Sequence, residues 1–83
     1  MIIHSPQELA MLVSNQRKKL NLSQATVASL VGLKQKTISA FENKPENVKL
    51  DTLFKILSAV NLDVKVLQKN KTDKNKTDWK QEW

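Results

Sequence analysis

The stretch from residue 34 to residue 39 carries polar side chains that are able to read nucleic acid bases. A lysine can donate to O6 and N7 of guanine, and a glutamine can bind N6 and N7 of adenine with two hydrogen bonds. Lys36 and Gln35 have these chemistries, Lys34 suits either a base or a phosphate, and Ser39 suits a phosphate. A solvated helix face would have the same residues, so their interpretation depends on the elements that position them.

Two short helices joined by a tight turn are predicted around this stretch. Ser23 is a good N-cap for a first helix over residues 24–31, and a second helix is predicted over residues 35–43. Gly32 lies between them, where a glycine can take the positive φ that a sharp turn after a helix needs. This order of elements is that of a helix-turn-helix, in which the second helix enters the major groove of duplex DNA.

The apolar residues of the same segment are spaced to hold the two helices at a fixed angle. Ala28 is small, so it allows the helices to approach closely, while Leu33 and Ile38 can fill the wedge between them. Phe41 continues the inward face of the second helix, because it follows Ile38 at helical spacing. With these side chains inside, the polar side chains of residues 34–39 must point outward.

Flanking helices are predicted over residues 6–20 and 50–60. Ser5 and Glu8 can form a capping box at the start of the first of them, and a loop is expected at residues 44–47. The apolar stripes expected to face the core are Leu9, Leu12, Val13, Gln16 and Leu20 in the first helix, and Leu50, Leu53, Phe54, Leu57 and Val60 in the last.

Residues 62–67 alternate between apolar and polar, which predicts a short strand. A single strand needs a partner for its backbone groups, and the simplest partner is the same strand of a second copy. We therefore expect an all-α bundle of four or five helices, with a short C-terminal β-strand that pairs between the subunits of a dimer. This DNA-binding and dimerisation domain would cover residues 5–67, and residues 68–83 would form a flexible tail because they are polar and rich in lysine.

The composition excludes several classes of protein. The 83 residues include one histidine, one glycine and no cysteine, so we expect no enzyme activity, no metal site and no cofactor. No segment reaches the roughly 20 apolar residues of a membrane-spanning helix, and the start lacks a secretion signal, which together predict a cytoplasmic protein without a membrane partner. The net charge of +6 favours a polyanionic partner, and nine basic against five acidic residues within 1–68 make the predicted domain itself basic.

The helix-turn-helix segment resembles the phage-repressor and Cro-like (XRE) family, to which lambda repressor belongs. The similarity covers about residues 8–62 and rests on Leu22 to Gln24, Val27, Ala28, Val31 to Leu33, Ile38, Ser39, Phe41 and Glu42. In that family an arginine of the first helix often pairs with the glutamate after the recognition helix, and Arg17 and Glu42 stand at matching positions. The resemblance implies sequence-specific binding of a palindromic operator in double-stranded DNA and repression of transcription.

A narrower resemblance is to the HipB-type antitoxins. It rests on residues 32–43, on residues 52–57 and on a tail that ends in Glu82-Trp83. The resemblance implies a homodimer that binds a HipA-type serine/threonine kinase toxin and represses its own operon together with that toxin. Trp83 and Trp79 would contact this partner, because tryptophan often anchors an interface, although loose cation–π contacts with nearby lysines would also account for them.

Further DNA contacts are predicted at the ends of the two central helices. Ser23 and Gln24 begin the first helix, where phosphate is favoured, although capping is the main role expected of Ser23. The complete set predicted to bind DNA is Ser23, Gln24, Lys34, Gln35, Lys36, Ser39, Asn43 and Lys44. Two other functions remain open at this stage: a stand-alone prophage-type repressor without a toxin, and a protein-binding module built on the same motif.

Overall fold

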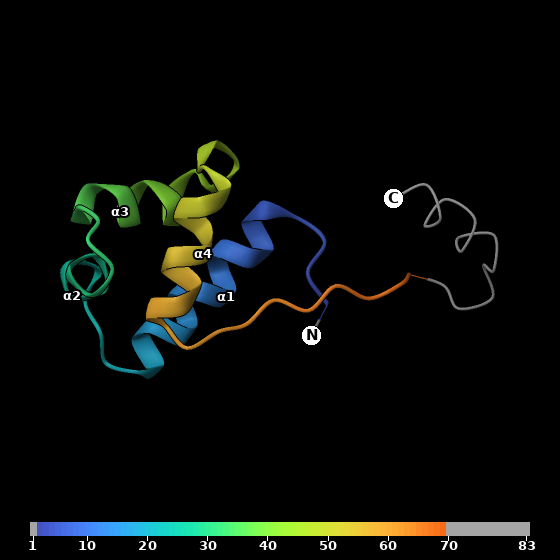
Figure 1. Ribbon diagram of the computed structural model, residues 1–83, viewed down its shortest axis with the longest axis horizontal. Coiled ribbons are helices and arrows are strands. Elements are labelled where there is room, and N and C mark those ends of the chain that lie inside the picture. The colour runs from blue at the N-terminus through green and yellow to red at the C-terminus, as the bar shows by residue number, and fades with distance from the viewer. Residues whose placement is uncertain (1, 70–83) are drawn as a thin grey trace.

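Four α-helices and one short 3₁₀ turn form the part of the chain that the computed structural model describes, residues 2–69 (Figure 1). In chain order they are α1 (Pro6–Lys19), α2 (Gln24–Leu30), α3 (Gln35–Asn43), the 3₁₀ turn η1 (Pro45–Asn47) and α4 (Leu50–Ala59). The four predicted helices are confirmed, each within one residue of its expected end. The loop predicted at residues 44–47 is wrong in part, because η1 forms there, with a proline in its first turn whose φ is preset for a helical turn.

Two serines begin helices, as predicted. Ser5 Oγ accepts from the Glu8 N–H at 3.1 Å at the start of α1, and Ser23 Oγ accepts from the Thr26 N–H at 3.0 Å at the start of α2. The Glu8 carboxylate accepts from the His4 N–H at 2.7 Å. The predicted capping box is therefore shifted by one residue, since in the usual arrangement Glu8 would accept from Ser5 itself.

Three of the four helices end with the same pair of residues, one with positive φ followed by a leucine. The pairs are Asn21–Leu22, Gly32–Leu33 and Asn61–Leu62, and the first residue of each has φ between 59° and 70°. Each leucine donates its N–H to the carbonyl five residues earlier, with N···O distances between 2.8 and 3.0 Å. This is the Schellman arrangement, which turns the chain sharply and packs each leucine back against the core.

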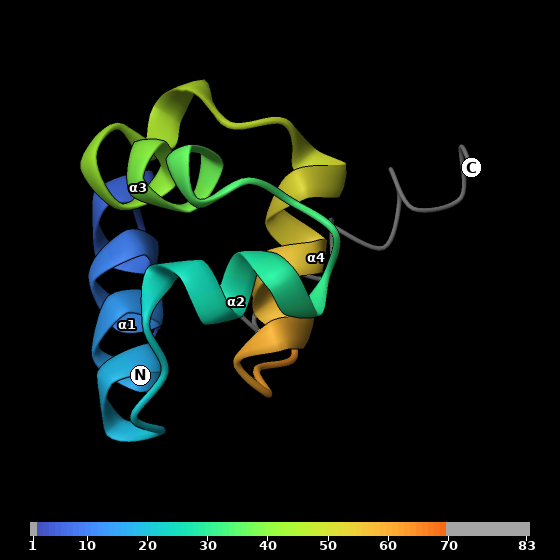
Figure 2. The same cartoon turned by 90° about the vertical axis from the view of Figure 1, so that its left-hand side faces the viewer.

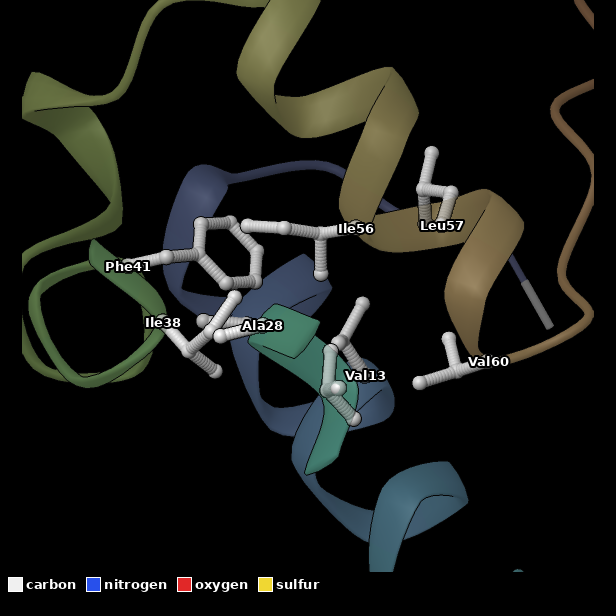
Figure 3. Close-up of a cluster of buried hydrophobic side chains, with 9 residues drawn as sticks. Val13, Ala28, Ile38, Phe41, Ile56, Leu57 and Val60 are labelled. Carbon is white, nitrogen blue, oxygen red and sulfur yellow. The ribbon is translucent and has the colours of Figure 1, made fainter. Parts of the chain in front are cut away.

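Side chains from all four helices meet in one core (Figure 3). Its fully buried members include Ile38 and Phe41 from α3 and Ile56 from α4. Ala28 is buried where α2 packs against α3, as a close approach of the two helices requires. In Figure 2, α1 and α4 stand on either side of α2, so the two central helices are supported from behind by the flanking pair.

The inward face of α1 differs slightly from the predicted stripe. Val13 is buried as expected, but Ala10 is buried as well, and Leu20 is exposed because it is the C-cap residue beyond the last turn. Gln16 has a polar role in this face: its Nε2 donates to the Val60 carbonyl at 3.1 Å. That hydrogen bond joins the end of α1 to the end of α4.

The stripe predicted for the last helix is wrong in part. α4 buries Ile56 and Leu57, whereas Leu50 and Phe54 are 67% and 52% exposed. Positions 53, 56, 57 and 60 have the same helical spacing as the predicted stripe, so α4 carries two overlapping apolar stripes. Only one of them can face the core, and the packing of α4 on the other helices selects it.

Beyond α4 the chain runs without helical coiling and leads away from the bundle (Figure 1). The strand predicted over residues 62–67 does not form within the described residues 2–69, because no other strand is present there to pair with it. Val64, Val66 and Leu67 are all more than half exposed in this segment. Pairing with a second copy stays a prediction.

Residues 70–83 lie outside the described residues, and they include Trp79, Trp83 and most of the predicted tail. Within residues 2–69, no helix combines the length and the apolar character that crossing a membrane requires.

Candidate nucleic-acid interface

α2 and α3 lie on the same side of the bundle, which faces the viewer in Figure 2. The turn between them is closed by a hydrogen bond from the Leu33 N–H to the Ala28 carbonyl at 2.8 Å. Gly32 has φ of +70°, and a Cβ atom built on it would meet nothing within 4 Å. The turn therefore needs glycine for its backbone conformation and not for lack of space.

The side chains predicted to read bases are exposed at the start of α3. Lys34, Gln35 and Lys36 are all exposed, while Ile38 in the same turn is fully buried. Lys34 is the N-cap residue of α3, but its side chain makes no capping hydrogen bond. The predicted outward orientation of this stretch is confirmed, and contact with a base stays a prediction.

A polar face continues along α3 from its first turn to its end. Lys36, Ser39 and Asn43 recur at intervals of three and four residues, which places them on one face of the helix. Asn43 Nδ2 donates to Ser39 Oγ at 3.3 Å, so the serine hydroxyl keeps its own proton for another acceptor such as a phosphate oxygen. Lys44 follows directly and is exposed.

Gln35 is held by hydrogen bonds that the sequence analysis missed. Its Nε2 donates to Gln24 Oε1 at 3.1 Å, and Gln24 Nε2 donates to Glu42 Oε1 at 3.0 Å. Arg17 binds both oxygens of Glu42, with Nε 2.7 Å from Oε2 and Nη2 3.0 Å from Oε1, and Nη1 donates to the Leu22 carbonyl. The Arg17–Glu42 pairing implied by the family resemblance is confirmed, whereas the link through Gln24 had no signal in the sequence.

The ion pair between Arg17 and Glu42 is largely enclosed, since the two side chains are only 11% and 10% exposed. Burial by itself raises the pKa of Glu42. The hydrogen bonds from Arg17 and Gln24 and the charge of Arg17 lower it by a larger amount, so the pKa lies below its ordinary value. The hydrogen bond to Glu42 correspondingly raises the pKa of Arg17. Both groups are therefore charged at neutral pH, and the Glu42 carboxylate acts only as an acceptor.

The residues at the start of α2 have roles within the fold. Ser23 is confirmed as the N-cap residue, and Gln24 is half-buried because it lies between Gln35 and Glu42. Phosphate contacts by Ser23 and Gln24 stay predictions. Among residues 2–69, no group of three or more histidine, aspartate or glutamate side chains is placed to hold a metal ion.

Comparison with known proteins agrees with this geometry. A family model described as helix-turn-helix matches residues 13–67, and the chain belongs to that family. The chain is 37% identical over 82 residues to the antitoxin HipB of Escherichia coli strain K12, with 93% of each chain covered. It is also 42% identical over 62 residues to the antitoxin HipB of Escherichia coli O6:H1, covering 75% of this chain and 66% of that one. These relatives place it in the HipB-type branch of the family.

Solved structures support the same grouping. A chain in a structure of a HipA-HipB-O2-O3 complex superposes with a TM-score of 0.81 at 37% identity, covering 84% of this chain and 99% of that one. A chain in a HipB-O4 20mer complex gives the same TM-score, identity and coverage. The predicted fold class, an all-α helix-turn-helix bundle, is confirmed by this similarity.

Proposed function

We propose that this protein is a dimeric transcriptional repressor of double-stranded DNA that also serves as the antitoxin of a HipA-type serine/threonine kinase toxin. The observation that carries the DNA-binding part is the exposed first turn of α3, where Lys34, Gln35 and Lys36 stand outward above the buried Ile38. A rigid helix with polar side chains at its exposed start is what a major groove accepts. We propose a cytoplasmic regulator without enzyme activity and without a cofactor.

The proposed DNA contacts fall into two groups. Gln35 and Lys36 read base edges in the major groove, because their amide and ammonium groups match adenine and guanine there. The other predicted residues bind the phosphate backbone and so set the register of α3 on the duplex. This second group consists of Ser23, Gln24, Ser39, Asn43 and Lys44, with Lys34 able to reach either a base or a phosphate.

The proposed dimer is supported by the exposed apolar residues of α4 and of the segment that follows it. A groove there is lined partly by Phe54, Leu62 and Val64, and the side chains of Phe54 and Val64 are each about half exposed. A second copy that pairs its own residues 62–67 antiparallel to these would cover them and satisfy the backbone groups of both segments. Residues 5–67 would thus bind DNA and dimerise, with the two copies of α3 about 34 Å apart on a palindrome.

The antitoxin part is supported by the similarity to a HipB antitoxin over nearly the whole chain and by the similarity to a chain solved in a HipA-HipB-O2-O3 complex. We propose that residues 68–83 form a flexible tail that reaches the kinase and that Trp83, with a smaller contribution from Trp79, enters a pocket on it.

A gel-shift titration on the DNA upstream of the protein's own gene tests the DNA-binding part. The double variant Gln35→Ala plus Lys36→Ala should lose discrimination between this DNA and an unrelated duplex by a factor of roughly 10–100, because a good base contact contributes about 1–3 kcal/mol. The matched control is Lys18→Ala, which removes an exposed positive charge from α1. Unchanged discrimination in the double variant would exclude base reading by this turn.

Co-purification with a HipA-type kinase encoded beside the gene tests the antitoxin part. The full chain should retain the kinase, and a chain that ends at residue 78 should retain much less of it. Trp79→Ala and Trp83→Ala, compared with Gln81→Ala, then separate the two tryptophans from the rest of the tail. Equal retention by the shortened chain would exclude the tail as the anchor, and no retention by the full chain would indicate a repressor without this toxin.

A further inference from the structure

A hollow opens where the first residues of the chain, η1 and the start of α4 meet, and we call it the N-terminal hollow. Two of the residues that line it, Phe41 and Pro45, are buried, whereas Leu50 at its rim is 67% exposed. Its volume of about 490 Å³ lies within the range of roughly 300–1,000 Å³ that small-molecule sites have, so an aromatic side chain fits into it. The N-terminal hollow takes no part in the proposed DNA contacts.

Most residues that line the N-terminal hollow are apolar, and they include one carboxylate, that of Glu46, but no lysine or arginine. Glu46 Oε1 accepts from Gln7 Nε2 at 3.1 Å, which holds this carboxylate in place. A carboxylate accepts several hydrogen bonds, so Glu46 can also receive the N–H of an indole or the ammonium group of a lysine. The N-terminal hollow therefore suits an aromatic side chain that carries a donor and has a positively charged neighbour.

Residues 70–83 contain a side chain of this kind. Their only apolar members are Trp79 and Trp83, and all the others are polar or charged. An indole has a large apolar surface, and its single N–H usually finds an acceptor when the ring is buried. Trp79 is directly followed by Lys80, whereas Trp83 is directly preceded by Glu82, whose charge the carboxylate of the hollow would repel. The chemistry of the hollow thus favours Trp79.

The chain is long enough to bring Trp79 to the N-terminal hollow. The first residues of the chain, which form one wall of the hollow, and the segment that leads to residue 69 both lie on the side of the bundle away from α2 (Figure 1). Ten residues lead from residue 69 to Trp79, and an extended chain of this length spans about 33–36 Å. The longest dimension of the described part is 45 Å. A short linker gives an effective concentration in the millimolar range, so a contact with a lower dissociation constant is mostly formed.

From these observations we infer that the N-terminal hollow is a docking site for Trp79 of the same chain. The indole occupies the apolar interior, and Glu46 faces Lys80. Lys49, which is exposed beside the rim, faces Asp78. The docking requires neither DNA nor a kinase, so it stands or falls independently of the proposed function. It leaves the second tryptophan free for the proposed kinase, whereas the first must leave the hollow before it contributes to that contact.

Tryptophan fluorescence tests the docking, because the chain has two tryptophans and both lie beyond residue 69. Trp83→Phe keeps Trp79 as the only tryptophan, and Trp79→Phe keeps Trp83. Both variants of the full chain are measured without DNA, by emission wavelength and by quenching with acrylamide. Trp79 should emit at a shorter wavelength than Trp83, and its quenching constant should be at least about 2-fold lower, since the docked form is more than half populated.

Leu50→Gln, in the protein that keeps Trp79 alone, tests whether the N-terminal hollow shields this tryptophan. Because Leu50 is 67% exposed, the bundle should remain folded, which circular dichroism checks. The emission and the quenching of Trp79 should then match those of Trp83. Met11→Gln is the matched control, since it replaces an exposed apolar side chain outside the hollow, and it should change neither value. Glu46→Lys should weaken the shielding, because it reverses the charge that the lysine after Trp79 meets.

Three results would overturn the inference. Equal quenching of Trp79 and Trp83 would show that Trp79 does not dock. Shielding of Trp79 that persists in Leu50→Gln would place the indole outside the N-terminal hollow. Phe54→Glu combined with Val64→Glu alters only the groove formed by α4 and the following segment, so it should leave Trp79 shielded. Loss of shielding in that variant would assign the contact to that groove or to a second copy of the chain.

Discussion

The α2–α3 side of the bundle carries polar side chains that are hydrogen-bonded to one another, whereas the segment that follows α4 carries exposed apolar side chains. On the α2–α3 side, polar residues meet one another within one chain, as Gln24, Gln35 and Glu42 do. In the segment after α4, Val64 and Val66 are exposed, and residues 62–69 form no ladder within the described part of the chain. The first region is complete in a single copy, whereas the second has the features of a surface that another copy completes.

This contrast suggests how the two tasks of the protein are divided. The base reading proposed for the start of α3 would require side chains held in a fixed geometry before DNA binds, and Gln35 is held by hydrogen bonds that lead to an enclosed ion pair. Dimerisation requires exposed apolar area and backbone groups that a second chain can cover. A single small domain can carry both the α2–α3 surface and the segment after α4, because the two are built from different elements of the chain.

The largest expected effect is on the segment that needs a second copy. Phe54→Glu combined with Val64→Glu should convert the dimer to a monomer, because it places charge in the groove that the second copy would cover. Affinity for a two-half-site duplex should then fall on the order of 10²–10⁴-fold, since the avidity of linked sites is lost. Light scattering gives the mass, and a gel shift gives the affinity.

The control for this pair is Met11→Glu, which adds a negative charge to an exposed apolar residue of α1. It should leave the mass and the affinity almost unchanged. A double variant that remains dimeric would show that the groove containing Phe54 and Val64 is not the dimer interface.

A smaller effect, on stability, is expected when the ion pair between Arg17 and Glu42 is removed. Arg17→Met leaves the Glu42 carboxylate without its ion-pair partner and should lower the free energy of unfolding by about 3 kcal/mol. Urea unfolding followed by circular dichroism measures this difference. Lys18→Met, at an exposed position beside Arg17, is the matched control and should change the free energy by less than about 0.5 kcal/mol.

The same ion pair predicts a pH dependence. The pKa of Glu42 is lower in the folded protein than its ordinary value of 4.5, so its contribution to stability is fully present above that pH and is lost as the pH falls through the lower folded value. Unfolding free energies of the wild type should therefore decrease on acidification in this range. In Arg17→Met the part of the decrease due to Glu42 should disappear, and an unchanged slope would assign the acid sensitivity to other carboxylates.

The smallest effect is expected for substitutions of Gly32, in the turn between α2 and α3. Gly32→Ala should lower the free energy of unfolding by about 1 kcal/mol, because alanine is strained at φ of +70° although space is available for its Cβ. Gly32→Asn should cost less, since asparagine tolerates this conformation and does so at Asn21 and Asn61 in this chain. Thermal unfolding of the three proteins gives the order, and an asparagine variant less stable than the alanine variant would contradict this account.

Local features of the chain were predictable because the interacting groups lie close together in sequence. Ser5 and Ser23 cap helices with partners three residues away, and the Gly32 turn is closed by residues five apart. The exposed polar stretch at the start of α3 followed in turn, since the buried positions around it were identified from helical spacing.

The face of α4 and the hydrogen bonds around Gln24 could not be predicted in the same way. The two stripes of α4 have identical spacing, so burial of Ile56 and exposure of Phe54 depend on how α4 packs. Gln24 meets Gln35 and Glu42 across separations of 11 and 18 residues. Neither contact exists until the helix crossing is established.

The amino-acid sequence by itself thus determined where each helix begins and ends, which turn joins α2 to α3 and which residues that turn exposes, because these depend on short-range hydrogen bonds and spacing. The tertiary structure alone decided which stripe of α4 is left exposed and which side chains join Glu42, Gln24 and Gln35 in one series of hydrogen bonds. Such choices arise from the angles at which helices cross, and a crossing angle is set by side chains that are distant along the chain.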